Sequence, residues 1–260
     1  MRMTVPGIGQ ALFGAVLLAV GVQALAVGDA AAILQPVAKD LPWREVWIPL
    51  GAAVLALGGA GILWPRSARV AAGLLLFALV LWIALFRIPV VIRAPNTQDA
   101  WSNLGEMAVY TAAALVLFAA RDVAGGVARA RAGGGVKAAH VLYGLALIPF
   151  GIAHFSYLKE TASLVPAYLP WHLAWAVATG AAYLAASLAI LSGVGARLAA
   201  LLCVIEMGGF TLLVWVPIVA AGGASAFAWN EFVISCVLTA SGWVLAESYR
   251  GEPWLALRRR

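Results

Sequence analysis

Eight long apolar stretches divide this chain, and each is close to the length that a helix needs to cross a lipid bilayer. A transmembrane helix requires about 20 predominantly apolar residues. Proline, glycine and charged residues separate the stretches, as is typical of the ends of membrane spans. The expected spans cover residues 8–28, 46–64, 68–91, 102–120, 138–158, 171–192, 196–220 and 228–248.

The composition argues against a water-soluble fold. Hydrophobic residues make up 64% of the 260 positions, only 11% are charged, and the mean hydropathy is +0.96. An ordinary soluble domain carries about 25% charged residues. We therefore predict an all-α membrane protein whose partner is the lipid bilayer and whose polar residues gather between the spans.

The second half of the chain repeats the first. Residues of the first half match residues about 130 positions later: Gly21 with Gly151, Pro36 with Pro166, Pro42-Trp43 with Pro170-Trp171, and Pro89 with Pro217. Such matches are informative because Gly, Pro and Trp have special backbone or interface roles. Each copy holds four spans, so both copies enter the membrane from the same side. The predicted fold is eight transmembrane helices arranged as two parallel-repeat four-helix bundles.

This repeat sets the expected domain boundaries. The first four-helix repeat covers 1–120, a basic Gly/Ala-rich cytoplasmic linker covers 121–137, the second repeat covers 138–249, and a basic cytoplasmic tail covers 250–260. The first apolar stretch also resembles a signal peptide, with Arg2 before it and Ala24-Leu25-Ala26 at its end. Its counterpart lies in mid-chain, so we interpret it as the first span.

The basic residues predict the orientation. With the N-terminus inside, 12 of the 17 Lys and Arg residues fall on the inner side, in agreement with the positive-inside rule. Both termini are therefore expected in the cytoplasm. The net charge of +6 is explained by these topology signals, and no nucleic-acid partner is expected. Cys203 and Cys236 lie in apolar stretches without CxxC spacing and are interpreted as packing residues.

Polar side chains inside the spans are the candidate functional residues, because a buried charge costs at least about 2.5–3.5 kcal/mol in a membrane. Glu206 lies near the middle of the seventh span, where the first copy has Ala78. It either lines a cavity or is a protonated side chain bonded to a neighbouring helix. His154 lies near the outer end of the fifth span, where the first copy has Ala24. It is either a ligand contact or a hydrogen-bonded core histidine.

Further candidates lie at a similar depth, and one outward-facing pocket could collect them. In the second copy they are Tyr157, Trp171, His172, Trp229 and Glu231; in the first copy they are Arg87 and Glu106. The two tryptophans also suit an interfacial belt. Arg87 is expected to snorkel to the surface or to pair with Glu106. The three histidines are spread in depth without HxxH or ExxH spacing, so no dedicated metal site is predicted.

The second half resembles the DoxX-type membrane proteins. The resemblance rests on GIAHF at 151–155, SLVPAYLP at 163–170 and SGVGARLAAL at 192–201, with LQPVAKDLPW at 34–43 as a reduced copy. It implies a four-helix module of the bacterial inner membrane, doubled here. Some members are linked to thiosulfate oxidation with transfer to quinone and others to oxidative-stress complexes. The family has no agreed catalytic set, so no catalytic residue is carried over.

Three functions follow as hypotheses. The first is a redox-associated subunit that binds a quinone-like apolar ligand near the outer leaflet, with a redox partner subunit or a homo-oligomer as its assembly. The second is a non-catalytic scaffold or small-molecule binder. The third is a transporter, which ranks last because neither copy shows the broken mid-span helix that marks a central transport site.

Overall fold

The eight predicted spans are confirmed. A computed structural model describes residues 7–34, 37, 40–119 and 134–256, and in these ranges the chain is helical, with no strand. Eight helical spans within the described ranges are long and apolar enough to cross a membrane. The N-terminal half contains α1 (Ile8–Val27), α2 (Arg44–Leu63), α3 (Ala68–Trp82), α4 (Ile88–Arg93) and α5 (Gln98–Ala119). The C-terminal half contains α6 (Gly134–Ser156), α8 (His172–Ser192), α9 (Ala196–Phe210), α10 (Val216–Ala220) and α11 (Ala226–Ser248).

Four shorter elements were not predicted. Each half has a one-turn or two-turn helix after its first span, η1 (Ala32–Leu34) and α7 (Leu158–Leu164). A π-helical segment joins α3 to α4 (η2, Ile83–Arg87), and another joins α9 to α10 (η5, Thr211–Trp215). A proline follows each π segment and cannot donate to the carbonyl four residues earlier. The wider π turn lets both spans continue past that proline.

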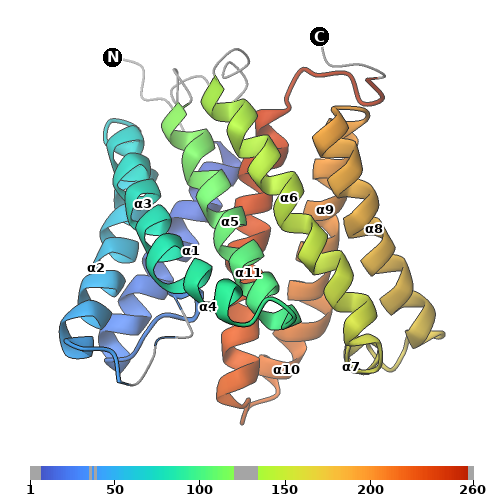
Figure 1. Ribbon diagram of the computed structural model, residues 1–260, viewed down its shortest axis with the longest axis horizontal. Coiled ribbons are helices and arrows are strands. Elements are labelled where there is room, and N and C mark those ends of the chain that lie inside the picture. Colours follow the sequence, from blue (N-terminus) through green and yellow to red (C-terminus); the bar gives the residue numbers. More distant parts are fainter. Residues whose placement is uncertain (1–6, 35–36, 38–39, 120–133, 257–260) are drawn as a thin grey trace.

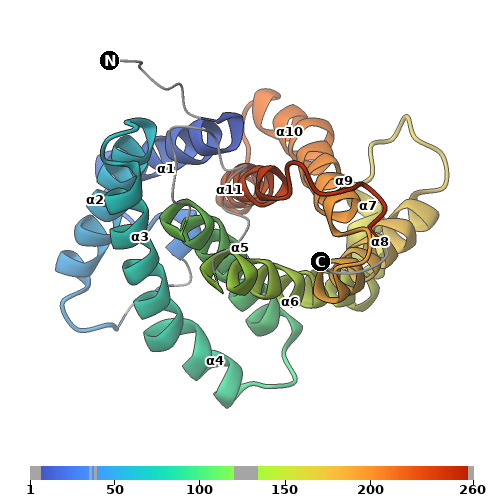
Figure 2. The same cartoon turned by 90° about the horizontal axis from the view of Figure 1, so that it is seen from above.

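The helices form one bundle in which α11 is central. Figure 2 shows α11 surrounded by α1, α5, α6 and α9, with α2 to α4 on one flank and α7 and α8 on the other. Helix α1 begins and α11 ends at the same face, here called the terminal face (Figure 1). The face that carries α7 and the end of α10 is called the opposite face. Each span therefore has a defined direction between these two faces.

Part of the linker predicted between the two repeats lies outside the described residues. Residues 121–133 of the expected linker lie outside the described residues, and α6 begins at Gly134, four residues earlier than predicted. The tail is described to residue 256 and folds against the start of α9. There Gly195 N donates to Ala256 O at 2.9 Å, and the Arg197 guanidinium lies 3.8 Å from the ring of Trp254.

Close approach at glycines holds the first two spans of each half together. A Cβ added to Gly21 would lie 2.3 Å from the backbone nitrogen of Ala56, and one added to Gly151 would lie 2.6 Å from Leu184. Small residues at such positions let helices pack closely in lipid, where van der Waals contact drives association. Ser187 adds a hydrogen bond of 2.7 Å to the carbonyl of Gly144.

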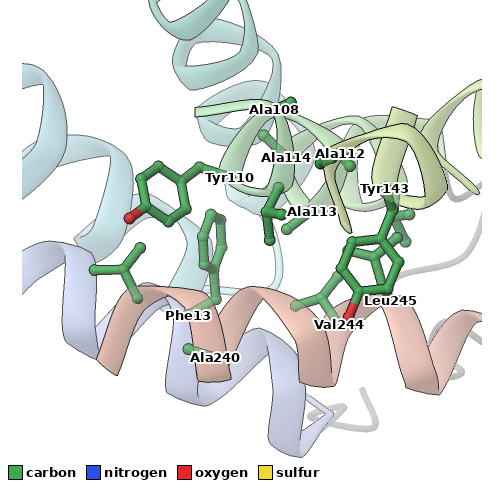
Figure 3. Close-up of a cluster of buried hydrophobic side chains, with 14 of the residues drawn as sticks. Phe13, Ala108, Tyr110, Ala112, Ala113, Ala114, Tyr143, Ala240, Val244 and Leu245 are labelled. Atoms are coloured by element: carbon green, nitrogen blue, oxygen red, sulfur yellow. The ribbon is translucent and has the colours of Figure 1, made fainter. Parts of the chain in front are cut away.

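The buried core lies where α1, α5, α6 and α11 meet. Figure 3 shows Phe13, Tyr110 and Tyr143 around the alanines of α5, with Val244 and Leu245 of α11 beside them. The small side chains of Ala112, Ala113 and Ala114 are fully buried. They let α5 approach several helices at once, which explains why α5 is the most buried of the eight spans.

Local irregularities recur 128 residues apart. The two π segments start at Ile83 and Thr211, and the only non-glycine residues with positive φ among the described residues are Trp43 (62°) and Trp171 (58°). Each of these tryptophans precedes the second long helix of its half. A left-handed conformation is uncommon for a bulky residue, so its recurrence at matched positions reflects a shared local backbone path.

Candidate functional site

A cavity of about 240 Å³ lies between helices of both halves near the opposite face. We call it the α5–α11 cavity, after the two helices that bring its carboxyl groups. Its polar lining comprises Ser102, Glu106, His154, Thr161, Glu231 and Ser235, and its apolar wall includes Phe150, Tyr183, Met207, Phe210, Trp215 and Leu238. A few polar groups in a largely apolar enclosure are typical of small-molecule sites, which usually measure about 300–1,000 Å³. A space of this size suits the head of a molecule whose remainder lies in the bilayer.

His154 reaches the cavity with one of its two ring nitrogens already engaged. Nδ1 lies 2.8 Å from the carbonyl oxygen of Phe150. A carbonyl can only accept, so Nδ1 carries the hydrogen and Nε2 of the neutral ring is an acceptor. Nε2 is buried and has no hydrogen-bond partner among the described residues. The imidazole therefore has one hydrogen-bonding position left for a ligand.

Helix α8 fixes the position of that imidazole. The ring centroid of His154 lies 5.4 Å from Tyr183 on α8 and 5.9 Å from Phe210 on α9. Gly180 faces it directly, because a Cβ added there would lie 2.7 Å from the Cβ of His154. The side chain is thus held between two aromatic rings and a helix backbone.

Two carboxyl groups reach the cavity from different halves of the chain. Glu106 lies two turns into α5, and Glu231 lies in the second turn of α11. Glu106 interacts electrostatically with both Glu231 and Arg87. The fold therefore brings together three of the predicted residues, Glu106, His154 and Glu231, in one cavity.

The sequence left two arrangements open for Arg87, snorkelling to the surface or pairing with Glu106, and the structure rules out the first. Only 3% of its surface is exposed, so it does not snorkel to the surface. It lies at the end of η2, where Glu106 and Tyr110 are its electrostatic neighbours. Its Nε has no hydrogen-bond partner within the described part of the chain. The guanidinium is an electrostatic neighbour of Glu106 and does not itself line the cavity.

Glu206 lies beside the cavity. Its neighbour Met207 lines the cavity, while the Glu206 carboxyl lies in the electrostatic field of Tyr183 and Cys203. The Oε1 atom is buried, and no described residue forms a hydrogen bond with it. One of the two interpretations from the sequence was that Glu206 is hydrogen-bonded to a neighbouring helix. At Oε1, no described residue supplies such a bond.

The remaining candidates lie at the surface of the opposite face. Trp171 is 80% exposed, Trp229 and Tyr157 are exposed, and His172 is half-buried at the start of α8; none lines the cavity in the described structure. The hydroxyl of Tyr157 donates to the carboxylate of Asp99, which raises the pKa of the phenol. These residues do not join His154 in one pocket, contrary to the expectation from depth alone.

Other lining residues were missed by the sequence. Ser102, Ser235, Phe210 and Trp215 are ordinary residues of apolar or weakly polar helices, and no motif marks them. Trp215 ends a π segment, and such segments are frequent at functional sites, but this segment was itself not predicted from the sequence.

The N-terminal half uses the corresponding space differently. There η1 inserts Ile33 and Leu34, both buried, and the indole of Trp82 donates to the Leu34 carbonyl at 3.1 Å. At the matching positions the C-terminal half has Ser163, which is exposed, and Leu164, which lines the cavity. At these positions, which the predicted repeat pairs with one another, the two halves therefore differ in what covers the neighbouring helices.

Comparisons with known proteins leave the site to be interpreted from its geometry. No protein-family model, curated protein or solved structure matches this chain. The DoxX-type resemblance of residues 151–201 accordingly stays a prediction.

Proposed function

We propose that this multi-pass membrane protein binds the ring head of a small, largely apolar, quinone-like molecule in the α5–α11 cavity. The observation that carries the proposal is the convergence of Glu106, His154 and Glu231 on one aromatic-walled cavity of about 240 Å³. Ionisable residues within a membrane span are costly, and they almost always face the interior of the helix bundle or a water-filled cavity, where they commonly mark a functional site. The cavity volume accommodates a ring, and an isoprenoid or alkyl tail would extend into lipid.

The hydrogen-bonding groups favour the hydroxyl-bearing form of such a ring. Neutral His154 presents only an acceptor at Nε2, as the Phe150 carbonyl holds the hydrogen at Nδ1. The carboxyl groups of Glu106 and Glu231 accept when ionised and donate when protonated, so Nε2 of His154 is the group that decides the preference. A quinol has an O–H donor for this acceptor, whereas a quinone has none. The ligand in this proposal is therefore a quinol, and the quinone is its weaker-binding partner.

We also propose the finer architecture that the sequence predicts. The two halves are parallel four-helix repeats related by an axis along the membrane normal, supported by the recurrence of the π segments and of the left-handed tryptophans. The terminal face is cytoplasmic, supported by the excess of Lys and Arg on that side. The α5–α11 cavity then lies toward the outer leaflet of a bacterial inner membrane.

The assignment to a redox assembly rests on the DoxX-type resemblance. In this proposal the chain supplies the quinol site, and a partner subunit or a second copy of the chain completes the assembly. The quinone pool is then the mobile carrier that links this chain to its redox partner.

A binding experiment tests the function. Purified protein is titrated with a short-chain ubiquinol, with the matching ubiquinone, and with the quinol dimethyl ether, which keeps the ring but has no O–H donor. We expect the affinity order quinol, then quinone, then ether. His154→Leu removes one hydrogen bond, worth about 0.5–1.5 kcal/mol, and should weaken quinol binding about 2- to 13-fold.

His172→Leu is the matched control, because His172 is also near the opposite face but does not line the cavity. It should leave the quinol affinity unchanged. If the protein binds none of the three compounds, and its organic extract contains no quinone by mass spectrometry, the scaffold hypothesis replaces this proposal.

A further inference from the structure

A second cavity, of about 550 Å³, lies where α1 ends and α2 begins. We call it the α1–α2 pocket, and it shares no lining residue with the α5–α11 cavity. Its volume falls within the usual range of small-molecule sites, about 300–1,000 Å³. Apolar and charged side chains both line it, among them Ala24, Leu25, Ile48, Asp40, Arg44 and Glu45. Such a mixed lining suits a ligand that has both a charged and an apolar part.

The pocket lies at the depth of lipid headgroups. Helix α1 begins at the terminal face, so its end, which lines the pocket, is at the opposite face (Figure 1). Trp43 and Trp47 are close to Arg44 along the chain, and they are 72% and 44% exposed. Exposed tryptophans are enriched at the boundary between membrane and water. A ligand of the pocket can therefore come from the lipid leaflet at the opposite face.

Arg44 has a hydrogen-bond donor that the described residues do not use. Its Nη2 donates to Oδ1 of Asp29 at 2.8 Å, which holds the guanidinium at the pocket. Its Nε is buried and has no hydrogen-bond partner in the described part of the chain. A buried donor without an acceptor is unfavourable, and the planar guanidinium matches the oxygens of a phosphate group. A ligand phosphate would supply the acceptor that Nε lacks.

The other charged residues of the pocket are acidic. Neither Asp40 nor Glu45 forms an ion pair with a described residue. The backbone carbonyl of Glu45 is a further acceptor, because Pro49, four residues later in α2, has no N–H to donate to it. Since Arg44 and Asp29 balance each other, the two remaining carboxylates give these four groups a net charge of −2. The pocket therefore favours a ligand with a cationic group and disfavours a purely anionic one.

We propose that the α1–α2 pocket binds the headgroup of phosphatidylethanolamine from the leaflet at the opposite face. The phosphate accepts from Nε of Arg44, the primary ammonium donates to the carboxylates of Asp40 and Glu45, and the acyl chains remain in the bilayer. Phosphatidylcholine has the same phosphate, but its quaternary ammonium has no N–H to donate. Phosphatidylglycerol has no cationic group and adds a negative charge. The inference does not depend on the proposed quinol site.

Native mass spectrometry of lipid adducts tests the pocket. The full-length protein in detergent is mixed with equal amounts of the three lipids, all with the same acyl chains. We expect the wild-type protein to retain phosphatidylethanolamine most, then phosphatidylcholine, then phosphatidylglycerol. Arg44→Met removes the phosphate donor and should weaken binding of the first two lipids about 2- to 10-fold. Glu45→Gln removes an ammonium acceptor and should lower the ratio of phosphatidylethanolamine to phosphatidylcholine by a similar factor.

Each variant has a control that makes the same charge change outside the pocket. Arg93 is an exposed arginine at the end of α4, and Glu160 is an exposed glutamate on α7. Neither lines the α1–α2 pocket. Arg93→Met and Glu160→Gln should therefore retain the three lipids in the same proportions as the wild type. Thermal unfolding of every variant in detergent confirms that it is folded.

Three outcomes would overturn the inference. The first is equal retention of the three lipids by the wild type, or a preference for phosphatidylglycerol. The second is unchanged lipid retention in folded Arg44→Met and Glu45→Gln proteins, which would place any lipid preference outside this pocket. The third is displacement of the bound lipid by an equal concentration of glycerophosphoethanolamine, the same headgroup without acyl chains. That result would identify a soluble ligand in place of a membrane lipid.

Discussion

Replacing Gly180 with alanine should push α8 away from α6 at the candidate site. The new Cβ would lie 2.7 Å from the Cβ of His154 and 3.2 Å from the carbonyl oxygen of Gly151. Carbon atoms in contact normally lie about 3.5–4.0 Å apart, so the two helices must separate by about 1 Å. Overpacking of this kind costs about 1–3 kcal/mol. Alanine offsets about 1 kcal/mol of this cost through its higher helix propensity.

The net expectation for Gly180→Ala is a loss of about 0–2 kcal/mol together with weaker quinol binding. A displacement of about 1 Å at His154 is enough to take Nε2 out of hydrogen-bond range, which extends to about 3.2 Å. Thermal unfolding in detergent measures the first effect, and a ubiquinol titration measures the second.

Gly209→Ala is the control, because a Cβ at Gly209 meets nothing within 4 Å. It gains the helix propensity without the overlap, so its melting temperature should not fall and its quinol affinity should match the wild type. Equal melting temperatures and equal affinities for the two variants would refute the close approach of α8 to His154.

Three further predictions concern other parts of the fold. The carboxylate of Glu247 accepts a hydrogen bond from Gly9 N at the start of α1 and pairs with Arg250 at 2.8 Å. Glu247→Ala removes both contacts and should lower the free energy of unfolding by about 1–3 kcal/mol, measured by thermal denaturation. Asp99→Asn removes the carboxylate that raises the pKa of Tyr157, so the phenol should ionise at lower pH in an absorbance titration at alkaline pH. Trp82→Phe loses the bond to the Leu34 carbonyl and should lower stability by about 1 kcal/mol in the same denaturation assay.

The spans themselves could be predicted because their signals are local. A transmembrane helix can be identified without knowledge of its neighbours, from the length and hydropathy of an apolar stretch and from the prolines and charges at its ends. The ends of the seventh span, 196–220, agree with the sequence prediction, and the other spans differ by a few residues at most. The π segments were missed, since a proline predicts a disturbance of the helix but does not specify how the helix absorbs it.

The candidate site was predicted only in part. Depth along the span placed His154 and Glu231 at a similar level, and both line the α5–α11 cavity. Depth also suggested Trp171 and His172, which lie at or near the surface, at the start of α8 and before its first buried residue, Ala176. Packing against neighbouring helices decides which side chains of similar depth line a cavity, and hydropathy gives no information about that packing.

The sequence by itself thus determined that the chain is helical and apolar enough to cross a membrane eight times, and it located polar residues where they are costly. Only the tertiary structure decided that Glu106 of the N-terminal half joins His154 and Glu231 of the C-terminal half, and that Ile33 and Leu34 cover the matching region of the other half. The physical reason is that helices in lipid gain little hydrophobic energy by facing one another. Their rotation and partners follow from side-chain packing, such as the contact of Gly180 with His154, which appears only when the helices are assembled.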